Sequence, residues 1–179
     1  MLDEAGSTSC RGARSRPWDT DRGVTGADER AGRGPQDARQ PVHSTPAVPR
    51  GVLVTGGSNG IGRAVVERFA RGGDRVWLTY RTGRQRGLGV AAELSACGWD
   101  VEAFEFDQGN WSSHERLLER LPGPVDVLVN NAAAGSKTIE RYVTGPAHEV
   151  EAAFLQINSV GPLWLIRQIL PGMLTPRES

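Results

Sequence analysis

The sequence predicts an α/β fold in which parallel strands alternate with helices. From Gly51 onward, short apolar runs of strand length alternate with longer segments whose apolar residues recur at helical spacing. A glycine-rich turn joins the first strand to the first helix. Strands that alternate with helices in this way form a doubly wound parallel sheet with right-handed crossovers.

The first three strand–helix units follow from apolar runs and glycine stop signals. Val52–Val54 is the first strand, and the helix after it ends at Gly72-Gly73. The second strand is followed by a helix that ends at Gly98, and the third by a helix that ends at Pro122. The predicted second strand, second helix and third strand are Arg75–Tyr80, Val90–Cys97 and Val101–Phe106.

The remaining elements complete a four-stranded sheet with the expected order 3-2-1-4. Val125–Val129 is the fourth strand, which this order leaves as an apolar edge. The segment Ala147–Leu174 has helical spacing, with a kink expected at Gly161-Pro162. An open apolar edge predicts marginal stability and a tendency to aggregate.

Residues 1–49 differ in composition from the rest of the chain, and this composition predicts a disordered tail. They are rich in Gly, Pro, Ser, Arg and Asp and have no apolar period, so they bury too little surface to offset their ordering entropy. Acidic residues interleave with the arginines, which disfavours a nucleic-acid arm or an organelle presequence and leaves open a translation start further downstream. The folded domain is therefore expected over residues 50–179.

Charge and residue counts exclude several classes of partner. Lys+Arg and Asp+Glu are both 21, so a net charge of zero gives no basis for binding nucleic acid or an anionic membrane. No apolar run approaches the ~20 residues of a membrane span. Two distant cysteines, Cys10 and Cys97, favour a reducing cytoplasmic setting over a disulfide framework. The three histidines lack metal-ligand spacing, so no metal site is predicted.

The stretch "TGGSNGIG", residues 55–62, predicts a phosphate-binding turn. A strand, a glycine-rich turn and a helix bring backbone N–H groups and the positive end of the helix dipole to one point, where a pyrophosphate binds. The spacing is Gly56-x-x-x-Gly60-x-Gly62. Glycines at these places allow a tight turn and close approach of the phosphate.

Three motifs, "VTGGSNGIG", "LVNNAAAG" and "LQINSVGPLWLIRQILPGM", together resemble the classical short-chain dehydrogenase/reductase family from about Gly51 to Met173. The resemblance implies a Rossmann-type NAD(P)-binding domain, incomplete at its C-terminus. Ala133 stands where the family usually has glycine. The cofactor-binding residues that the resemblance implies in the turn and in the asparagine motif are Thr55, Gly56, Ser58, Asn59, Gly60, Ile61, Gly62, Asn131, Ala132 and Ala133.

Cofactor choice is expected at the end of the second strand. A carboxylate there binds the adenosine ribose of NAD(H), whereas an arginine pairs with the 2′-phosphate of NADP(H). This chain has Arg81 at that place, which favours NADP(H) over NAD(H); a solvated strand-end charge is the alternative. Asp107, after the third strand, matches the family position that contacts adenine, and as a helix N-cap or turn residue it would have a structural role as well.

The resemblance supplies one catalytic residue and lacks the others. Asn158 matches the asparagine of the family's proton relay. The family's Tyr-x-x-x-Lys pair is absent, since Lys137 is the only lysine and Ala133 stands four residues before it. No serine stands in the catalytic serine's context. The chain is therefore expected to be a catalytically incomplete fragment.

Two classes of function remain. By resemblance, the complete protein is an NADP(H)-dependent oxidoreductase of the 3-oxoacyl-acyl-carrier-protein reductase kind, acting on a small carbonyl or alcohol, with a homo-oligomer as a possible assembly. An enoyl-acyl-carrier-protein reductase is the alternative among enzymes, because "NNAAAG" resembles those too. The other class is a non-catalytic protein that binds a nucleotide or a partner.

Overall fold

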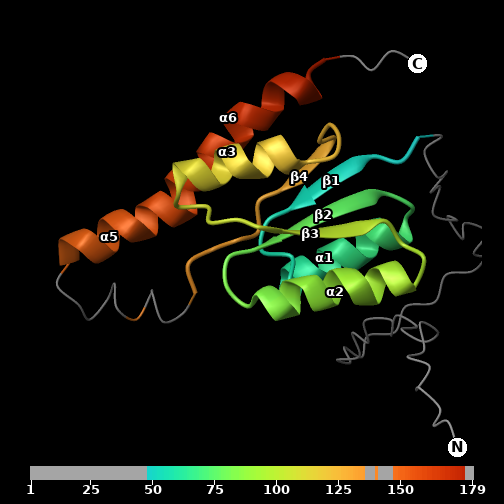
Figure 1. The fold of residues 1–179 in the computed structure, drawn as a ribbon. Coiled ribbons are helices and arrows are strands. Elements are labelled where there is room, and N and C mark those ends of the chain that lie inside the picture. Colours follow the sequence, from blue (N-terminus) through green and yellow to red (C-terminus); the bar gives the residue numbers. More distant parts are fainter. Residues whose placement is uncertain (1–47, 136–139, 141–146, 176–179) are drawn as a thin grey trace, which may run out of the picture. The chain divides into compact units, whose positions relative to one another are not determined.

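The computed structural model describes residues 48–135, 140 and 147–175 (Figure 1). The predicted disordered tail lies outside this part, except for residues 48 and 49. Strands and helices alternate from Gly51 to Val129, and a long helical segment follows. The elements are β1 (Gly51–Val54), α1 (Gly60–Arg71), β2 (Arg75–Tyr80), α2 (Arg84–Ala96), β3 (Val101–Glu105), α3 (Trp111–Arg120), β4 (Val127–Val129), α5 (Ala147–Leu155), the π-helical turn η1 (Gln156–Val160) and α6 (Gly161–Met173).

The four strands form one parallel sheet in the order β3-β2-β1-β4, which confirms the predicted order. Leu53 of β1 lies opposite Trp77 of β2 on one side and Leu128 of β4 on the other. Because all strands run the same way, their carboxyl ends meet at one edge. The loops that carry the predicted site residues leave from that edge.

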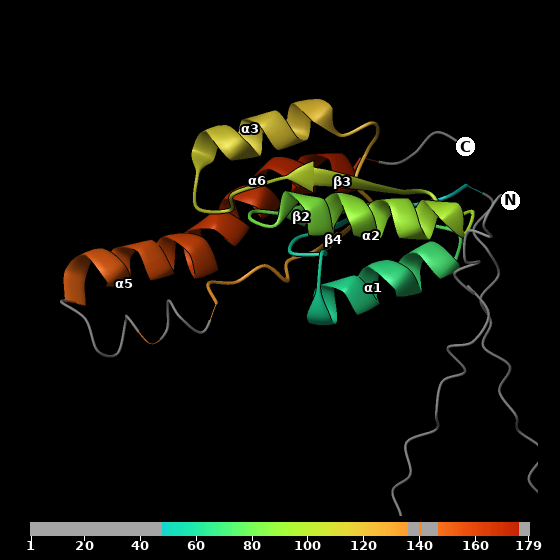
Figure 2. The ribbon, with the colours of Figure 1, turned by 60° about the horizontal axis from the view of Figure 1, so that its bottom comes forward.

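Helices cover both faces of the sheet, as Figures 1 and 2 show: α1 and α2 lie on one face, and α3 and α6 on the other. Alternate residues of each strand point to opposite faces. Val52, Val54 and Leu78 pack in the cluster under α1 and α2. Leu53 and Trp77 pack in the second cluster, with Leu117 of α3 and Leu165 of α6 among their partners.

The second helix begins six residues earlier than predicted, at Arg84 in place of Val90. The six residues 84–89 contain two glycines and two arginines, which weaken the helical pattern of the sequence there. Within the fold Gly87 faces the ring of Tyr80, where a Cβ would meet ring carbons. A glycine at this point lets α2 approach β2 closely, so packing outweighs low helix propensity.

Two strands are shorter than predicted. β3 ends at Glu105, and β4 begins at Val127, two residues after the predicted start. Before β4, the backbone N–H of Gly51 donates to Asp126 Oδ2 over 2.7 Å. The side chain thus takes the role that a main-chain carbonyl would have in a longer strand.

The last segment is helical from Ala147 to Met173, and its irregularity ends directly before Gly161-Pro162, where the kink was predicted. The irregularity comes just before it, as the π-helical turn η1, and Gly161 keeps helical φ and ψ. Pro162 has no N–H to donate to the carbonyl of Asn158 four residues earlier, so regular α-helical bonding fails in that turn. Single π-helical turns of this kind occur mostly inside helices and often at functional sites.

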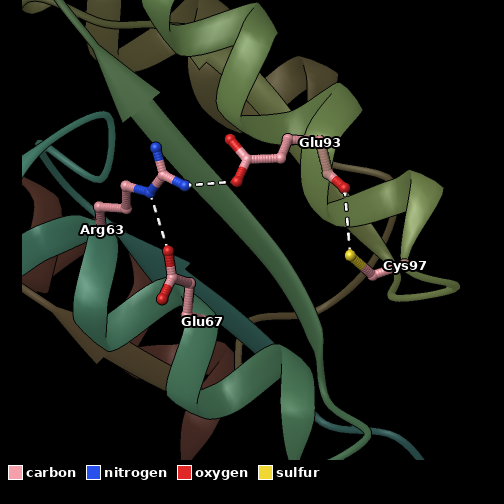
Figure 3. Close-up of polar contacts among 4 residues, drawn as sticks. All are labelled: Arg63, Glu67, Glu93 and Cys97. Atoms are coloured by element: carbon pink, nitrogen blue, oxygen red, sulfur yellow. Dashed lines mark hydrogen bonds and ion pairs between the residues drawn. The ribbon is translucent and has the colours of Figure 1, made fainter. Parts of the chain in front are cut away.

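Figure 3 shows how α1 and α2 are joined across their exposed sides. Arg63 donates to Glu67 of its own helix over 2.8 Å and to Glu93 of α2 over 2.7 Å. These carboxylates raise the pKa of Arg63 above its usual value, chiefly through the hydrogen bond to Glu67. Cys97 Sγ lies 3.4 Å from the carbonyl oxygen of Glu93.

A bidentate ion pair fastens the start of β1 to the start of β2. Arg50 Nε and Nη2 donate to the two carboxylate oxygens of Asp74 over 2.9 and 2.8 Å. The Asp74 side chain is 3% exposed, whereas the nearby pair of Arg75 and Asp100 is about half exposed on both sides. Hydrogen bonding to Asp74 is the main cause that raises the pKa of Arg50.

We predict that Asp74→Asn lowers the free energy of unfolding by about 1–3 kcal/mol, because it removes a charged acceptor and leaves buried polar groups poorly paired. Asp100→Asn is the matched control, since its exposed pair contributes less than about 1 kcal/mol. Urea denaturation of both variants measures the difference. Equal losses would contradict the role assigned to Asp74.

Candidate functional site

The glycine turn leads from β1 into α1 with two left-handed residues. Gly56 has φ of 68° and Gly60 has φ of 51°, a region that L side chains rarely adopt. The N–H of Gly56 donates to Thr79 Oγ1 on β2 over 3.2 Å. Helix α1 begins at Gly60, so its unpaired N–H groups and the positive end of its dipole face the turn.

Asn131 and Thr55 tie the carboxyl ends of β1 and β4 together. Asn131 Nδ2 donates to the carbonyl oxygens of Thr55 and Gly56 over 3.0 and 3.2 Å. In return, Thr55 Oγ1 accepts from the backbone N–H groups of Asn131 and Ala132, each over 3.0 Å. Thr55 is fully buried, so it holds the backbone of the site in place and is not exposed to a ligand.

Gly62 permits a close approach between helix α1, the glycine turn and Asn131. A Cβ at this position would lie 2.5 Å from Asn131 Nδ2 and would also meet the carbonyl oxygen of Gly56. The turn, the helix and the Asn131 amide therefore pack without room for a methyl group. At Gly60, by contrast, a Cβ would have nothing within 4 Å.

Basic side chains lie after the end of β2. Arg81 is exposed and lines the same cavity as the glycine turn, together with Thr82 and Arg86. Arg86 lies in the first turn of α2, ahead of the helix start predicted at Val90. Two arginines therefore line the cavity beyond the end of β2.

Asp107 forms a turn between β3 and α3. Its Oδ1 accepts from the N–H of Gly109 over 3.0 Å, and its own N–H donates to Ser113 Oγ over 2.8 Å. The N-cap of α3 is Asn110, so the turn alternative for Asp107 is confirmed and the N-cap alternative is wrong.

Asn158 lies in the π-helical turn η1 and is half-buried. Its Oδ1 accepts from the backbone N–H of Ala134 over 2.8 Å. The partner is thus a donor on another segment, the turn after β4. No local sequence pattern predicts this contact, because it joins residues 24 positions apart.

These segments enclose a cavity of about 550 Å³ at the carboxyl edge of the sheet. Among the predicted site residues, Thr55, Gly60 and Asn158 are not part of its lining, and the others are. Its lining residues that the sequence analysis did not place in the site are Thr79, Tyr80, Thr82, Arg86, Phe106, Gln108, Ala134, Gly135 and Ile157. A volume of this size is typical of pockets for small molecules and cofactors.

A second hollow of about 380 Å³ adjoins the first. It shares Arg81 and Asp107 with the larger cavity and extends along α3 past Arg116 and Arg120. The guanidinium of Arg120 lies over the ring of Phe104, 5.6 Å from its centroid. Arg81 therefore stands between two hollows.

Neither a metal centre nor a membrane span is found in the described part of the chain. No group of three or more His, Cys, Asp or Glu residues there is arranged to hold a metal ion. None of its helices is long and apolar enough to cross a bilayer. His114 is fully buried, and its Nε2 pairs with the carbonyl oxygen of Gln108 over 2.9 Å. His43 lies outside the described residues.

The sequence pattern of the family described as "short chain dehydrogenase" matches residues 50–179. The chain belongs to the short-chain dehydrogenase/reductase family. This membership confirms the resemblance carried by the three motifs and the Rossmann-type fold. The family pattern begins where the composition of the chain changes, at the last residue before β1.

Three relatives illustrate where the chain stands in the short-chain dehydrogenase/reductase family. It is 30% identical to 3-dehydrosphinganine reductase TSC10A of Arabidopsis thaliana over 80% of this chain and 41% of that protein. It is 32% identical to NADP-dependent 3-hydroxy acid dehydrogenase YdfG of Salmonella typhi over 69% of this chain and 48% of that protein. A blue fluorescent protein from a metagenomic library, solved in complex with NADPH, superposes with a TM-score of 0.57 at 30% identity over 69% of this chain and 51% of its own. The chain thus spans about half the length of these relatives or less.

We predict that Gly62→Ala disrupts the site more than Gly60→Ala does. The methyl group at residue 62 displaces the Asn131 amide, an overpacking cost of about 1–3 kcal/mol in unfolding free energy. At residue 60 the cost is backbone strain alone, about 1 kcal/mol. Thermal unfolding of both variants, with Asn131 amide signals followed by NMR, checks the order. Larger changes at Asn131 in the residue-60 variant would contradict it.

Proposed function

We propose that this chain binds NADP(H) in the cavity at the carboxyl edge of the sheet. The observation that carries the proposal is that one cavity of about 550 Å³ is lined both by the glycine turn and by Arg81. The first supplies backbone N–H groups and a helix N-terminus for a pyrophosphate. The second supplies a guanidinium for a further phosphate.

The chemistry of the lining sets the direction of the bound dinucleotide. The pyrophosphate lies at the turn from Gly56 to Gly62, with Ser58 and Asn59 adding hydrogen bonds. The adenosine lies toward Arg81 and Asp107, on the β2 and β3 side. The nicotinamide lies toward the turn after β4, which Asn158 holds from η1 through its bond to Ala134.

Preference for NADP(H) over NAD(H) follows from the residues after β2. Arg81, Thr82 and Arg86 line the cavity there, and no carboxylate stands among them to bind a ribose 2′-hydroxyl or repel a phosphate. A related structure contains NADPH, and YdfG is named as NADP-dependent. Both facts support the same choice of cofactor for this chain.

For the whole protein we propose oxidation and reduction between a small alcohol and a carbonyl compound, with the 3-oxoacyl-acyl-carrier-protein reductase kind as the first candidate. Hydride transfer is the chemistry that the nicotinamide supplies when bound. Asn158 is the one relay residue of that chemistry in this sequence. A homo-oligomer and a cytoplasmic location belong to the same proposal.

A non-catalytic nucleotide-binding role is the second candidate, because residues 1–179 contain no Tyr-x-x-x-Lys pair. In the family, the lysine of that pair lowers the pKa of the tyrosine, which then donates a proton to the carbonyl oxygen; this sequence has no such pair. We therefore predict cofactor binding without turnover for residues 1–179. NADPH oxidation with a panel of 3-oxoacyl and simple carbonyl substrates measures this, and any turnover above that of a Gly62→Ala variant would contradict it.

The test of the cofactor proposal is titration with NADPH and NADH, followed by nicotinamide fluorescence. We predict that Arg81→Ala weakens NADPH binding by about 1–3 kcal/mol, the scale of a charge-assisted hydrogen bond, and leaves NADH binding nearly unchanged. The matched control is Arg84→Ala, which removes the same charge three residues away, from a side chain that is 72% exposed and outside the cavity lining.

Two results would overturn the proposal. A folded wild-type chain that binds neither nucleotide has no cofactor site. An equal loss of NADPH affinity in the Arg81 and Arg84 variants would show general charge attraction in place of a phosphate contact.

A further inference from the structure

Gln108 is a buried amide that joins two segments distant in the sequence. It follows β3 and is 3% exposed. Its Nε2 donates to the carbonyl oxygen of Ala132, in the turn after β4, over 3.1 Å. The same nitrogen donates to the carbonyl oxygen of Ile157, in the π-helical turn η1, over 2.6 Å. One amide group therefore holds two walls of the cavity at a fixed separation.

The main chain of Gln108 is held as firmly as its side chain. The carbonyl oxygen accepts from Nε2 of His114, which is fully buried in α3. Gly161 packs against the same carbonyl so closely that a Cβ there would overlap it. Contacts with α3 and α6 thus fix the backbone of Gln108. The position of its side-chain amide in the site therefore depends on those two helices.

The orientation of the amide is fixed by what it faces. Both partners of the side chain are carbonyl oxygens, which accept and never donate, so only the NH₂ group fits between them. Gln108 Oε1 is buried and has no hydrogen-bond partner among the described residues. An unpaired buried acceptor costs free energy, so the two donated bonds outweigh that cost.

A second hydrogen bond joins the same two segments, the turn after β4 and η1. Ala134, two residues after Ala132, donates its N–H to Oδ1 of Asn158, the residue after Ile157, over 2.8 Å. This bond requires that η1 and the turn after β4 keep their relative position. We propose that Gln108 is a positioning residue, which holds Asn158 and the turn after β4 in the geometry that the proposed cofactor site needs; the functional part of this inference rests on NADP(H) binding there.

The experiment measures hydrogen exchange of the Ala134 amide by NMR in the full chain. Wild type is compared with Gln108→Met, which keeps the size of the side chain and removes the donor. We expect the protection of Ala134 to fall about tenfold, the effect of losing a buried hydrogen bond, while amides of β1 and α1 keep their protection. Gln156→Met is the matched control, because Gln156 makes one long bond of 3.4 Å to Gly109.

Gln108→Glu gives a readout that a packing role would not produce. An ionised carboxylate would face two carbonyl oxygens, so burial and repulsion raise the pKa of the introduced group. Once protonated, that group can donate one bond. At pH 8 we therefore expect the Ala134 amide to be less protected from hydrogen exchange in Gln108→Glu than in Gln108→Met. As the pH falls through the raised pKa of the introduced carboxyl group, the protection of Ala134 should recover.

The outcomes separate this inference from the cofactor proposal. Unchanged protection of Ala134 in Gln108→Met, or a loss spread evenly over β1 and α1, would overturn the positioning role. Absence of pH-dependent recovery in Gln108→Glu would overturn the donor role. Failure of wild type to bind NADPH would overturn the cofactor proposal alone, because the exchange measurement needs no nucleotide.

Discussion

The side chain of Asn131 holds the carboxyl ends of β1 and β4 together, and the rest of the site is arranged around it. Its amide satisfies two carbonyl oxygens of the glycine turn, and Thr55 returns two bonds to the backbone after β4. An open turn between strand and helix would otherwise leave these carbonyls without partners below the surface. The constraint explains why Gly62 has no side chain, since a methyl group there would occupy the place of the amide.

Two further sets of hydrogen bonds, on either side of Asn131, hold the walls of the cavity. On one side, the turn N–H of Gly56 bonds to Thr79 and keeps the glycine turn over the end of β2, where Arg81 and Arg86 stand. On the other side, Gln108 and Asn158 hold the turn after β4 against η1. The arrangement leaves a hollow with N–H donors at its centre and guanidinium groups at one end, which matches the charge distribution of a phosphorylated dinucleotide.

Sequence patterns predicted the parts of this structure that depend on neighbours in the chain. The glycine turn, the strand order and most strand ends followed from local composition and from family resemblance. Helix α2 was predicted too short, because its first turns depend on the contact between Gly87 and Tyr80, which has no local signal. The bonds of Gln108 were missed for the same reason, since their partners lie 24 and 49 residues away, whereas η1 lies directly before the irregularity predicted at Gly161-Pro162. A correct start for α2 would have placed Arg86 in the first helical turn.

The central claim is that the hollow between the glycine turn, Arg81 and the turn after β4 takes a phosphorylated dinucleotide. Its most direct test is an NMR titration of the isotope-labelled chain with NADPH, with each backbone amide followed separately. The account predicts that the largest shifts fall on Gly56–Gly62, Arg81, Asp107 and Asn131–Ala134, with small shifts along the α3 hollow at Arg116 and Arg120. Shifts concentrated at Arg116 and Arg120, or none at the glycine turn, would contradict it.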